Sequence, residues 1–169
     1  AEKIDSGKVL KLPPNVMNAS NMEFFVKRQI KENIRYDNRF STIVVSFGIL
    51  FEDGKKVFTG NYINELYTPV FKILRKLLRD IDLIGIIEVE GRQYIWLLLP
   101  MTEQEGADIV SDRVNNKIRS VSVKKDDKKG SLLSVAAALE FRLEDTEDFD
   151  QYKNKIVSLH SNKLNSLKQ

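Results

Sequence analysis

Four acidic side chains lie close together in the sequence and are the first candidates for chemistry. Asp80, Asp82, Glu88 and Glu90 carry the hard oxygen atoms that divalent cations prefer. Their spacing matches no diagnostic ligand pattern, so a second interpretation stays open, in which they are solvated charges at the ends of strands. The sequence favours solvated charges, and we predict no bound metal and no cofactor.

Other chemistries are limited by which residue types the chain lacks. The 169 residues include no cysteine and one histidine, His160. A disulfide, a thiolate zinc site and a cysteine nucleophile are therefore excluded. A single histidine also excludes a histidine metal cluster and argues against a Ser-His-Asp arrangement. We expect His160 to lie exposed near the end of the chain and assign it no role.

Charge and hydropathy restrict the class of partner. The chain has 27 Lys and Arg against 24 Asp and Glu, a net charge of +3 that indicates a mixed surface. The segment 124–130 is predicted to be a charged loop, and it lacks the aromatic residues that stack on nucleic acid bases. No apolar run approaches the roughly 20 residues that span a bilayer. We therefore expect no nucleic acid partner and no membrane insertion of this segment.

The first half of the chain predicts a lead-in segment, a helix, a strand and a second helix. Residues 1–20 are predicted to be a linker, because they are polar and contain adjacent prolines, and 21–169 to be the domain. A capping box of Ser20 and Glu23 predicts a helix over 21–36. The apolar run 41–51 predicts a strand that returns briefly after the Asp53-Gly54 turn.

Apolar residues at helical spacing predict a second helix over 61–79, in which Pro69 marks either a start or a kink. Two apolar runs, 82–89 and 92–100, then predict a hairpin, and Trp96 and Tyr94 are expected to fill the core.

The last third predicts a helix, an ambiguous segment and a final helix. A capping box of Thr102 and Glu105 predicts a helix that ends near Arg119. Segment 131–141 is compatible with a helix or a strand, since its alanines favour one and its length the other. Thr146 is predicted to cap a last helix. Its buried stripe is expected to comprise Phe149, Tyr152, Ile156 and Leu159.

The predicted order of elements is helix, strand, helix, hairpin, helix, strand, helix. Such alternation around one hairpin predicts an α+β fold of the ferredoxin-like kind, with helices covering a mainly antiparallel sheet.

The middle of the chain resembles the core of GGDEF domains, the diguanylate cyclase family with its nucleotidyl cyclase palm fold. The similar features are Arg79-x-x-Asp82, the hairpin, the apolar strand that ends in Pro100, and the helix opening at 102–105. Asn21 and the Phe24-Phe25 pair resemble the family's entry to its first helix. The resemblance covers residues 21–165 and rests on the order and spacing of motifs that are individually weak.

The resemblance implies two metal-binding positions, and the chain departs from both. The family holds its cations with carboxylates, one of them near the end of the first strand, where Ser46 and Gly48 stand here. The signature turn is replaced by Glu90-Gly91-Arg92-Gln93-Tyr94. Arg92 puts a cation where an acid is needed, and Glu90 adds negative charge where triphosphate would lie. We therefore expect a degenerate site and no enzymatic activity.

Arg79 and Asp82 are the family positions that could still bind a ligand. An Arg-x-x-Asp before the signature binds cyclic di-GMP in many family members, through the guanidinium and the carboxylate. Here the seven residues 83–89 separate it from the turn, two more than the family has. In the other interpretation, Arg79 is a cation at a helix C-terminus, stabilised by the helix dipole.

The resemblance implies a catalytically inactive regulatory domain in a bacterial signalling protein. We expect it to bind a protein partner or itself, in the cytoplasm or as the soluble part of a larger, membrane-attached protein. The alternative is a receptor for cyclic di-GMP or another nucleotide through Arg79 and Asp82. A third hypothesis is residual cyclase or phosphodiesterase activity with Glu88 or Glu90 as substitute metal ligands.

Overall fold

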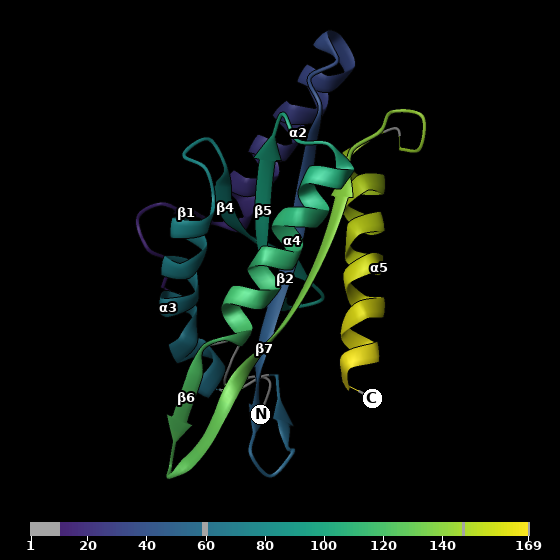
Figure 1. Cartoon of the computed structure of the whole chain (residues 1–169). Helices are drawn as coiled ribbons and strands as arrows, with labels where there is room; N and C mark the ends of the chain where they lie inside the picture. Colours follow the sequence, from purple (N-terminus) through teal and green to yellow (C-terminus); the bar gives the residue numbers. More distant parts are fainter. Residues whose placement is uncertain (1–10, 59–60, 147, 169) are drawn as a thin grey trace.

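A seven-stranded sheet carries helices on both faces (Figure 1). The computed structural model describes residues 11–58, 61–146 and 148–168. Within these residues, the strands are β1 (Val16–Met17), β2 (Phe40–Phe51), β3 (Lys56–Val57), β4 (Leu83–Val89), β5 (Arg92–Pro100), β6 (Ser122–Lys125) and β7 (Lys128–Glu140). The helices are α2 (Ala19–Tyr36), α3 (Asn61–Leu77), α4 (Gln104–Arg119) and α5 (Phe149–Lys168). None of the helices described is both long enough and apolar enough to cross a membrane.

The strand order confirms the predicted α+β, ferredoxin-like fold. The order is β1-β4-β5-β2-β7-β6, and β3 pairs with β2 beyond the end of β5. Only the short β1 runs parallel to its neighbour, so the sheet is mainly antiparallel. The central strands β4-β5-β2-β7 come from the unit β2-α3-β4-β5-α4-β7, which is the split β-α-β layout. The ambiguous segment 131–141 lies almost entirely in strand β7.

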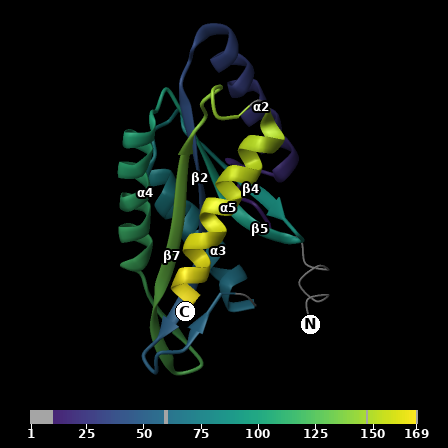
Figure 2. The same ribbon diagram turned by 90° about the vertical axis from the view of Figure 1, so that its right-hand side faces the viewer.

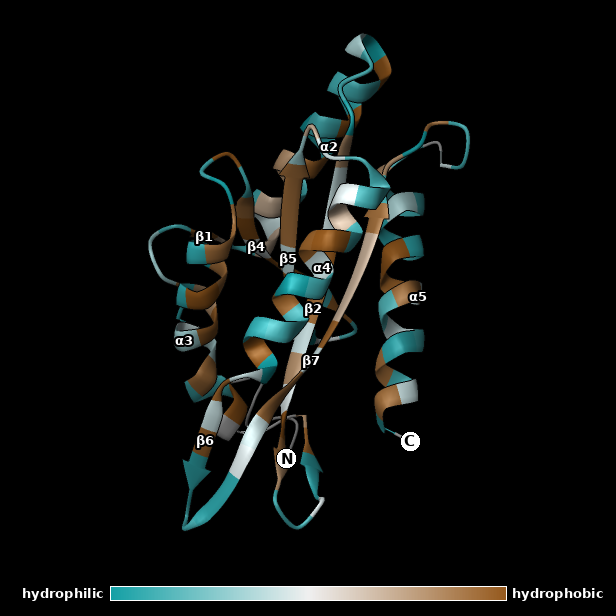
Figure 3. Cartoon of the chain, viewed as in Figure 1, coloured by the Kyte–Doolittle hydropathy of each residue, from teal (hydrophilic) through white to brown (hydrophobic). Residues whose placement is uncertain are grey.

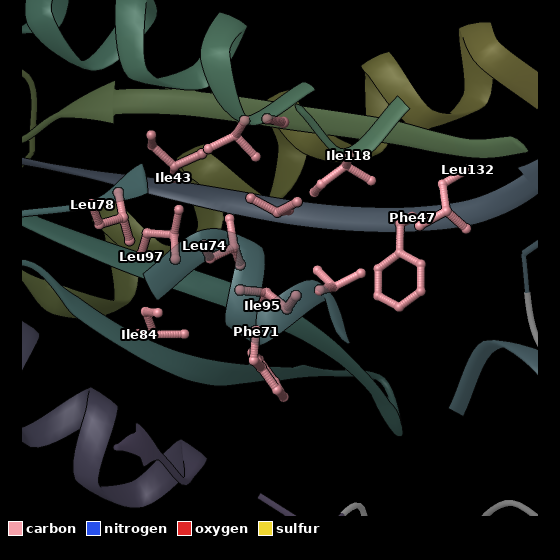
Figure 4. Close-up of a cluster of buried hydrophobic side chains, with 14 of the residues drawn as sticks. Ile43, Phe47, Phe71, Leu74, Leu78, Ile84, Ile95, Leu97, Ile118 and Leu132 are labelled. Carbon is pink, nitrogen blue, oxygen red and sulfur yellow. The ribbon is translucent and has the colours of Figure 1, made fainter. Parts of the chain in front are cut away.

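Two apolar cores, one on each face, hold the helices to the sheet. The larger core lies under α3 and α4 and includes Phe71, Leu74 and Ile118 (Figure 4). The other core lies under α2 and α5, which Figure 2 shows on the opposite side of β7 from α4. It contains Trp96 and, at its margin, Tyr94, as predicted. Because side chains alternate along a strand, β2 supplies both cores and is buried along nearly its whole length.

The helix starts differ from the predicted capping boxes. Asn18 caps α2, since its side-chain oxygen accepts the backbone N–H of Asn21 at 2.8 Å. The Ser20 capping box is therefore wrong. At α4, the backbone N–H of Gln104 donates to the carboxylate of Glu140 at 2.9 Å, so the Thr102 capping box is wrong as well. A carboxylate from β7 satisfies this helix end and suits its positive dipole.

Two further helix predictions are corrected. Helix α3 begins before Pro69 and runs through it, so the proline does not start the helix. Its missing N–H removes one helical hydrogen bond, while the apolar face on both sides of it, Ile63 and Val70, packs into the larger core. The hydroxyl of Thr146 donates to the carbonyl of Arg142 and caps no helix. Asp148, directly before α5, accepts the backbone N–H of Gln151 instead.

The charged segment 124–130 is not a loop. It forms the end of a β6–β7 hairpin, with Lys125 paired to Lys128. The two turn residues, Asp126 and Asp127, have φ of 51° and 64°. Two positive φ values in a two-residue turn match the twist of the flanking strands, so the hairpin forms despite its charge. Residues 16–20, predicted to belong to the linker, form β1 and the start of α2, and residues 1–10 lie outside the described residues.

Candidate functional site

Ser46, one of two residues at the first-strand position where the resemblance implies a metal-binding acid, makes a buried hydrogen bond. Its Oγ lies 2.7 Å from Nε2 of His160 on α5. The histidine side chain is buried, with 1% of its surface exposed, and the prediction that it is exposed was wrong. It occupies the stripe position that we expected for Leu159, which is 39% exposed. Burial is tolerated because the hydroxyl of Ser46 satisfies the imidazole.

The surroundings of His160 keep its imidazole neutral at pH 7. The ring of Tyr94 lies 4.8 Å from the imidazole, centroid to centroid. Burial, with smaller effects from the positive charges of Lys163 and Lys168, lowers the pKa of His160 to about 4. A neutral imidazole bonded to a hydroxyl offers no anionic oxygen to a divalent cation.

Gly48, the other residue at this first-strand position, has no room for a side chain. A Cβ built there would lie 2.5 Å from the carbonyl oxygen of Val57 and 2.7 Å from the ring of Phe58. The obstruction comes from the chain beyond β2, because β3 folds back and pairs Val57 with Ile49. A carboxylate at position 48 would require this strand to move.

The degenerate signature 90–94 forms the turn and the first residues of β5. Glu90 and Gly91 are the turn residues, with φ of 50° and 78°, and Val89 pairs with Arg92. This confirms the predicted hairpin. Glu90, Gly91 and Arg92 are exposed, whereas Gln93 and Tyr94 are partly buried. The turn therefore presents one acid and one cation to solvent, side by side.

The hairpin is held against α3 by a residue that the sequence analysis did not select. The hydroxyl of Tyr67 donates to the carbonyl oxygen of Gln93 at 3.1 Å, and its ring lies 4.9 Å from that of Phe47. Burial, with a smaller effect from Tyr94, raises the pKa of Tyr67 to about 12. Tyr67 is therefore a neutral donor that fixes the start of β5.

The two halves of the metal site that the resemblance implies lie on strands that separate. Strand β5 pairs with β2 only as far as Val45 and Ile95, and β3 begins its pairing with β2 at Ile49. Figure 2 shows the β4–β5 hairpin diverging from β2 toward its turn. Ser46 and Gly48 thus pair with β7 on one side, and no strand pairing of these residues with β5 is present.

Arg79 and Asp82, the predicted ligand-binding pair, contact each other. Both carboxylate oxygens of Asp82 lie within 3.2 Å of Nε of Arg79, and Nη2 lies 2.8 Å from Oδ1. The backbone N–H of Arg79 also donates to Asp82 at 2.8 Å. Nη2 further donates to the carbonyl of Pro100 and to the hydroxyl of Thr102. The pair ties the end of α3 to the end of β5, and whether it binds a ligand stays a prediction.

The four acids of the first candidate group do not behave alike. Asp80, Glu88 and Glu90 are exposed, as expected for solvated charges. Asp82 is buried, with 2% of its surface exposed, so that interpretation was wrong for this residue. In the described part of the chain, no three acidic or histidine side chains come together in a way that could hold a metal ion. Asn21 lies exposed in the first turn of α2.

Sequence reasoning missed Phe58, Tyr67 and His160, which surround the positions implied by the resemblance. One signal was present for His160, since it continues the spacing of Tyr152 and Ile156 along α5. Nothing local indicated that Tyr67 would contact β5.

Comparison with known proteins shows which solved structures share this fold. No family model and no curated protein matches the sequence. Solved structures do match. The GGDEF domain of FimX from Pseudomonas aeruginosa is 9% identical, with a TM-score of 0.72, 94% of this chain covered and 96% of that one. The diguanylate cyclase SiaD from the same organism, solved with its activator SiaC, is 18% identical with a TM-score of 0.69.

The SiaD match covers 88% of this chain, which spans only 55% of SiaD. A third match is the coiled coil and GGDEF domain of DgcB from Caulobacter crescentus, in complex with c-di-GMP. It is 8% identical, with a TM-score of 0.66, 99% of this chain covered and 84% of that one. The chain therefore has the fold of GGDEF domains, as the resemblance predicted. Identities this low show the fold and leave the activity to be argued from the site.

Proposed function

We propose that this domain is a catalytically inactive regulatory module with the GGDEF fold, which acts by binding a protein partner or a second copy in a bacterial signalling protein. One observation carries the proposal: both positions implied for the first metal-binding acid are filled by the protein's own packing. Ser46 is bonded to His160, and β3 leaves no space beyond Cα at Gly48. Two cations bridging phosphates need several carboxylates in one place.

The charges on the hairpin support the same conclusion. Arg92 is exposed at the position where the resemblance implies an acid. Two like charges about 4 Å apart repel each other by about 1 kcal/mol in water, and by more where water is excluded. A divalent cation beside Arg92 would be repelled accordingly.

The interaction role is supported by the completeness of the scaffold around the proposed inactive site. The fold is intact, with both cores filled and seven strands paired. SiaD, a protein of this fold, was solved with an activator protein bound. A domain that keeps this scaffold without a metal site is suited to binding a partner through its surface.

The direct test is turnover of GTP by the purified chain with Mg²⁺ or Mn²⁺. We expect no divalent-dependent product. The hypothesis of residual activity through Glu88 or Glu90 predicts turnover that Glu90→Gln abolishes, and this result would overturn the proposal. Sedimentation of the same sample distinguishes self-association from a need for another protein.

A cyclic di-GMP receptor is the second candidate, because the Arg79 side chain is half exposed and its Nη1 makes no hydrogen bond within the described residues. Isothermal titration with cyclic di-GMP tests it, with GTP and Mg²⁺ in parallel. Micromolar binding that Arg79→Ala removes and Asp80→Asn keeps would establish the receptor. Circular dichroism of Arg79→Ala must show an intact fold, since Arg79 also holds Pro100 and Thr102.

A further inference from the structure

The β6–β7 hairpin extends beyond the helices at one end of the sheet (Figure 1). Figure 3 shows that its tip is hydrophilic. Helix α4 ends at Arg119, before β6 begins, and β6 is the last strand of the sheet on that side. Ser122 and Lys124 of this edge strand are both exposed.

The backbone of β6 carries hydrogen-bonding groups that no strand of the described residues uses. In a two-residue hairpin, the pair next to the turn exchanges hydrogen bonds, and bonded pairs then alternate. Lys125 and Lys128 form that first pair, and the bond from the N–H of Leu132 to the carbonyl of Val121 fits the same alternation. The N–H and C=O groups of Ser122 and Lys124 therefore point away from β7, toward the outer edge of the sheet.

Two lysines face each other across this hairpin. Lys124 pairs with Lys129 in the register, at a position without mutual backbone hydrogen bonds, where side chains come closest. Like charges directly opposite each other destabilise a strand pair. Neither lysine forms an ion pair in the described part of the chain, although Glu52 lies nearby.

The paired lysines line a shallow hollow of about 700 Å³. Ser122 and Ser131 form the next cross-strand pair beside them, and Leu50 of β2 lines the same hollow. On the opposite face of β6, Val123 packs against the larger core. One face of the edge strand thus carries Ser122 and Lys124, and the other carries the apolar Val123 followed by Lys125, which is paired with Glu65 of α3.

From this arrangement we propose that β6 binds an extended segment of a partner protein with alternating acidic and apolar residues. The segment adds to the sheet as a further strand through the outward N–H and C=O groups of Ser122 and Lys124. Its acidic side chains lie over Lys124 and Lys129 and relieve their repulsion, while its apolar side chains lie on the face of Val123.

The charge of the edge favours this occupant over a second copy of the chain. Two β6 strands pairing with each other would bring their lysines together, and charged edges of this kind resist self-pairing. Nucleic acid is disfavoured as the partner. The paired strand segments that carry Lys124 and Lys129 contain no aromatic side chain on which a base could stack. An acidic strand alone uses both the charge and the unpaired backbone.

This inference rests on the proposed protein-interaction function and can be tested with a defined probe. The probe is a fluorescein-labelled, capped peptide of sequence Thr-Glu-Val-Glu-Val-Glu-Thr, titrated with the whole chain and followed by anisotropy. We expect saturable binding that weakens as salt is raised. The same peptide with lysine in place of glutamate should not bind.

Two variants separate strand addition from general charge attraction. Ser122→Pro keeps every lysine and all β6–β7 hydrogen bonds but removes an outward N–H, and it should weaken binding at least tenfold. The double substitution Lys124→Glu with Lys129→Glu should also weaken peptide binding at least tenfold. Lys31→Glu with Lys76→Glu makes the same change of net charge at exposed sites of α2 and α3 and should leave binding within twofold. Circular dichroism checks that each variant is folded.

Several outcomes would overturn the inference. The first two are that the peptide does not bind the chain, or that it binds the Ser122→Pro variant equally well. The third is that an oligothymidylate or anionic vesicles bind more tightly than the peptide. The fourth is that the chain forms a dimer that Ser122→Pro dissociates. None of them bears on the GTP assay, so the inactivity part of the proposed function stands or falls separately. Conversely, GTP turnover would contradict that function without changing the peptide result.

Discussion

Asp82 shows how one carboxylate can hold two elements together. Its side chain is buried and bonded to both the backbone and the guanidinium of Arg79. We expect Asp82→Asn to lower the free energy of unfolding by about 1–3 kcal/mol, because the charge-assisted pair is lost and the amide NH2 group replaces one of the two oxygens that accept from Arg79. Urea unfolding measures the change.

The neighbouring residue provides the control. Asp80 is exposed, so Asp80→Asn removes the same charge and should change the free energy of unfolding by less than about 0.5 kcal/mol. Equal effects of the two substitutions would mean that Asp82 acts through net charge. The contacts that join α3 to β5 would then contribute nothing measurable to the free energy of unfolding.

His160 makes the stability of the domain depend on pH. Its pKa is lowered from the ordinary value of 6.5 to about 4 in the folded state. The unfolded chain therefore binds a proton more readily between these values. The stabilisation is fully present above about pH 6.5 and is lost as the pH falls toward 4. From pH 7 to pH 5, this loss amounts to about 2 kcal/mol.

A variant without the titrating group isolates this contribution. Carboxylates also titrate in acid, so the informative quantity is the difference between the wild type and His160→Gln, measured by urea unfolding at both pH values. The wild type should lose about 2 kcal/mol more than the variant. Parallel curves for the two proteins would show that the imidazole titrates normally and that the contact with Ser46 does not exclude water.

His160 also shows what the sequence could and could not predict about single residues. The spacing of Phe149, Tyr152 and Ile156 predicted the buried stripe of α5 correctly. The next position is polar, and its burial depends on a hydroxyl on β2, 114 residues away in the chain. Local periodicity carries no information about such a partner. The same holds for Tyr67, whose acceptor lies on another strand.

At the scale of elements, β3 has an effect out of proportion to its length. It is only two residues long, yet it places the Val57 carbonyl and the Phe58 ring over Gly48. We expect Gly48→Ala to destabilise the domain by about 1–3 kcal/mol, because the new methyl group overlaps backbone that cannot rotate away. Thermal or urea unfolding tests this.

Gly106 is the matched position for this experiment. A Cβ there meets only the methyl group of Thr102, at 3.2 Å, and the residue lies in α4, where alanine is favoured over glycine. Gly106→Ala should therefore cause no loss of stability. If Gly48→Ala were equally harmless, β3 would yield easily, and the closure of this site could not explain a lack of activity.

Periodicity predicted the existence and type of the main elements, but it did not place their first and last residues accurately. The long apolar runs predicted β2, β4 and β5 because a sheet buried on both faces needs continuous apolar strands. The start of α4 was misplaced because its cap, Glu140, lies 36 residues further along the chain. The lysine-rich hairpin was misread because its charge obscured a favourable turn.

At the scale of the whole molecule, this chain shares its fold with proteins whose sequences are almost entirely different from its own. Structures with identities of 8% to 18% align over most of this chain with TM-scores of 0.66 to 0.72. The pattern of buried and exposed positions is what such proteins share, and many sequences satisfy it. This pattern does not fix the residue types of a site, because it requires only that position 46 be buried, and the hydroxyl of a serine satisfies that requirement through His160.

This separation predicts that introducing the family signature will not by itself confer cyclase activity. Replacing Glu90→Gly, Arg92→Glu, Gln93→Glu and Tyr94→Phe together with Ser46→Asp would supply the acids that the resemblance implies. We expect a folded protein that still turns over no GTP with Mg²⁺ or Mn²⁺. Position 46 would face His160 in a buried site, and β3 would still cover Gly48.

The measurement is release of pyrophosphate from GTP, with circular dichroism to confirm that the variant is folded. Turnover by the variant would show that the acids alone are sufficient for activity in this fold, and the packing around β2 would then be incidental. Continued silence, followed by turnover once residues 52–58 are also replaced by a shorter turn, would identify β3 as the element that closes the site. The first result would mean that the site lacks only metal ligands. The second would mean that the packing of β3 against β2 also blocks the site.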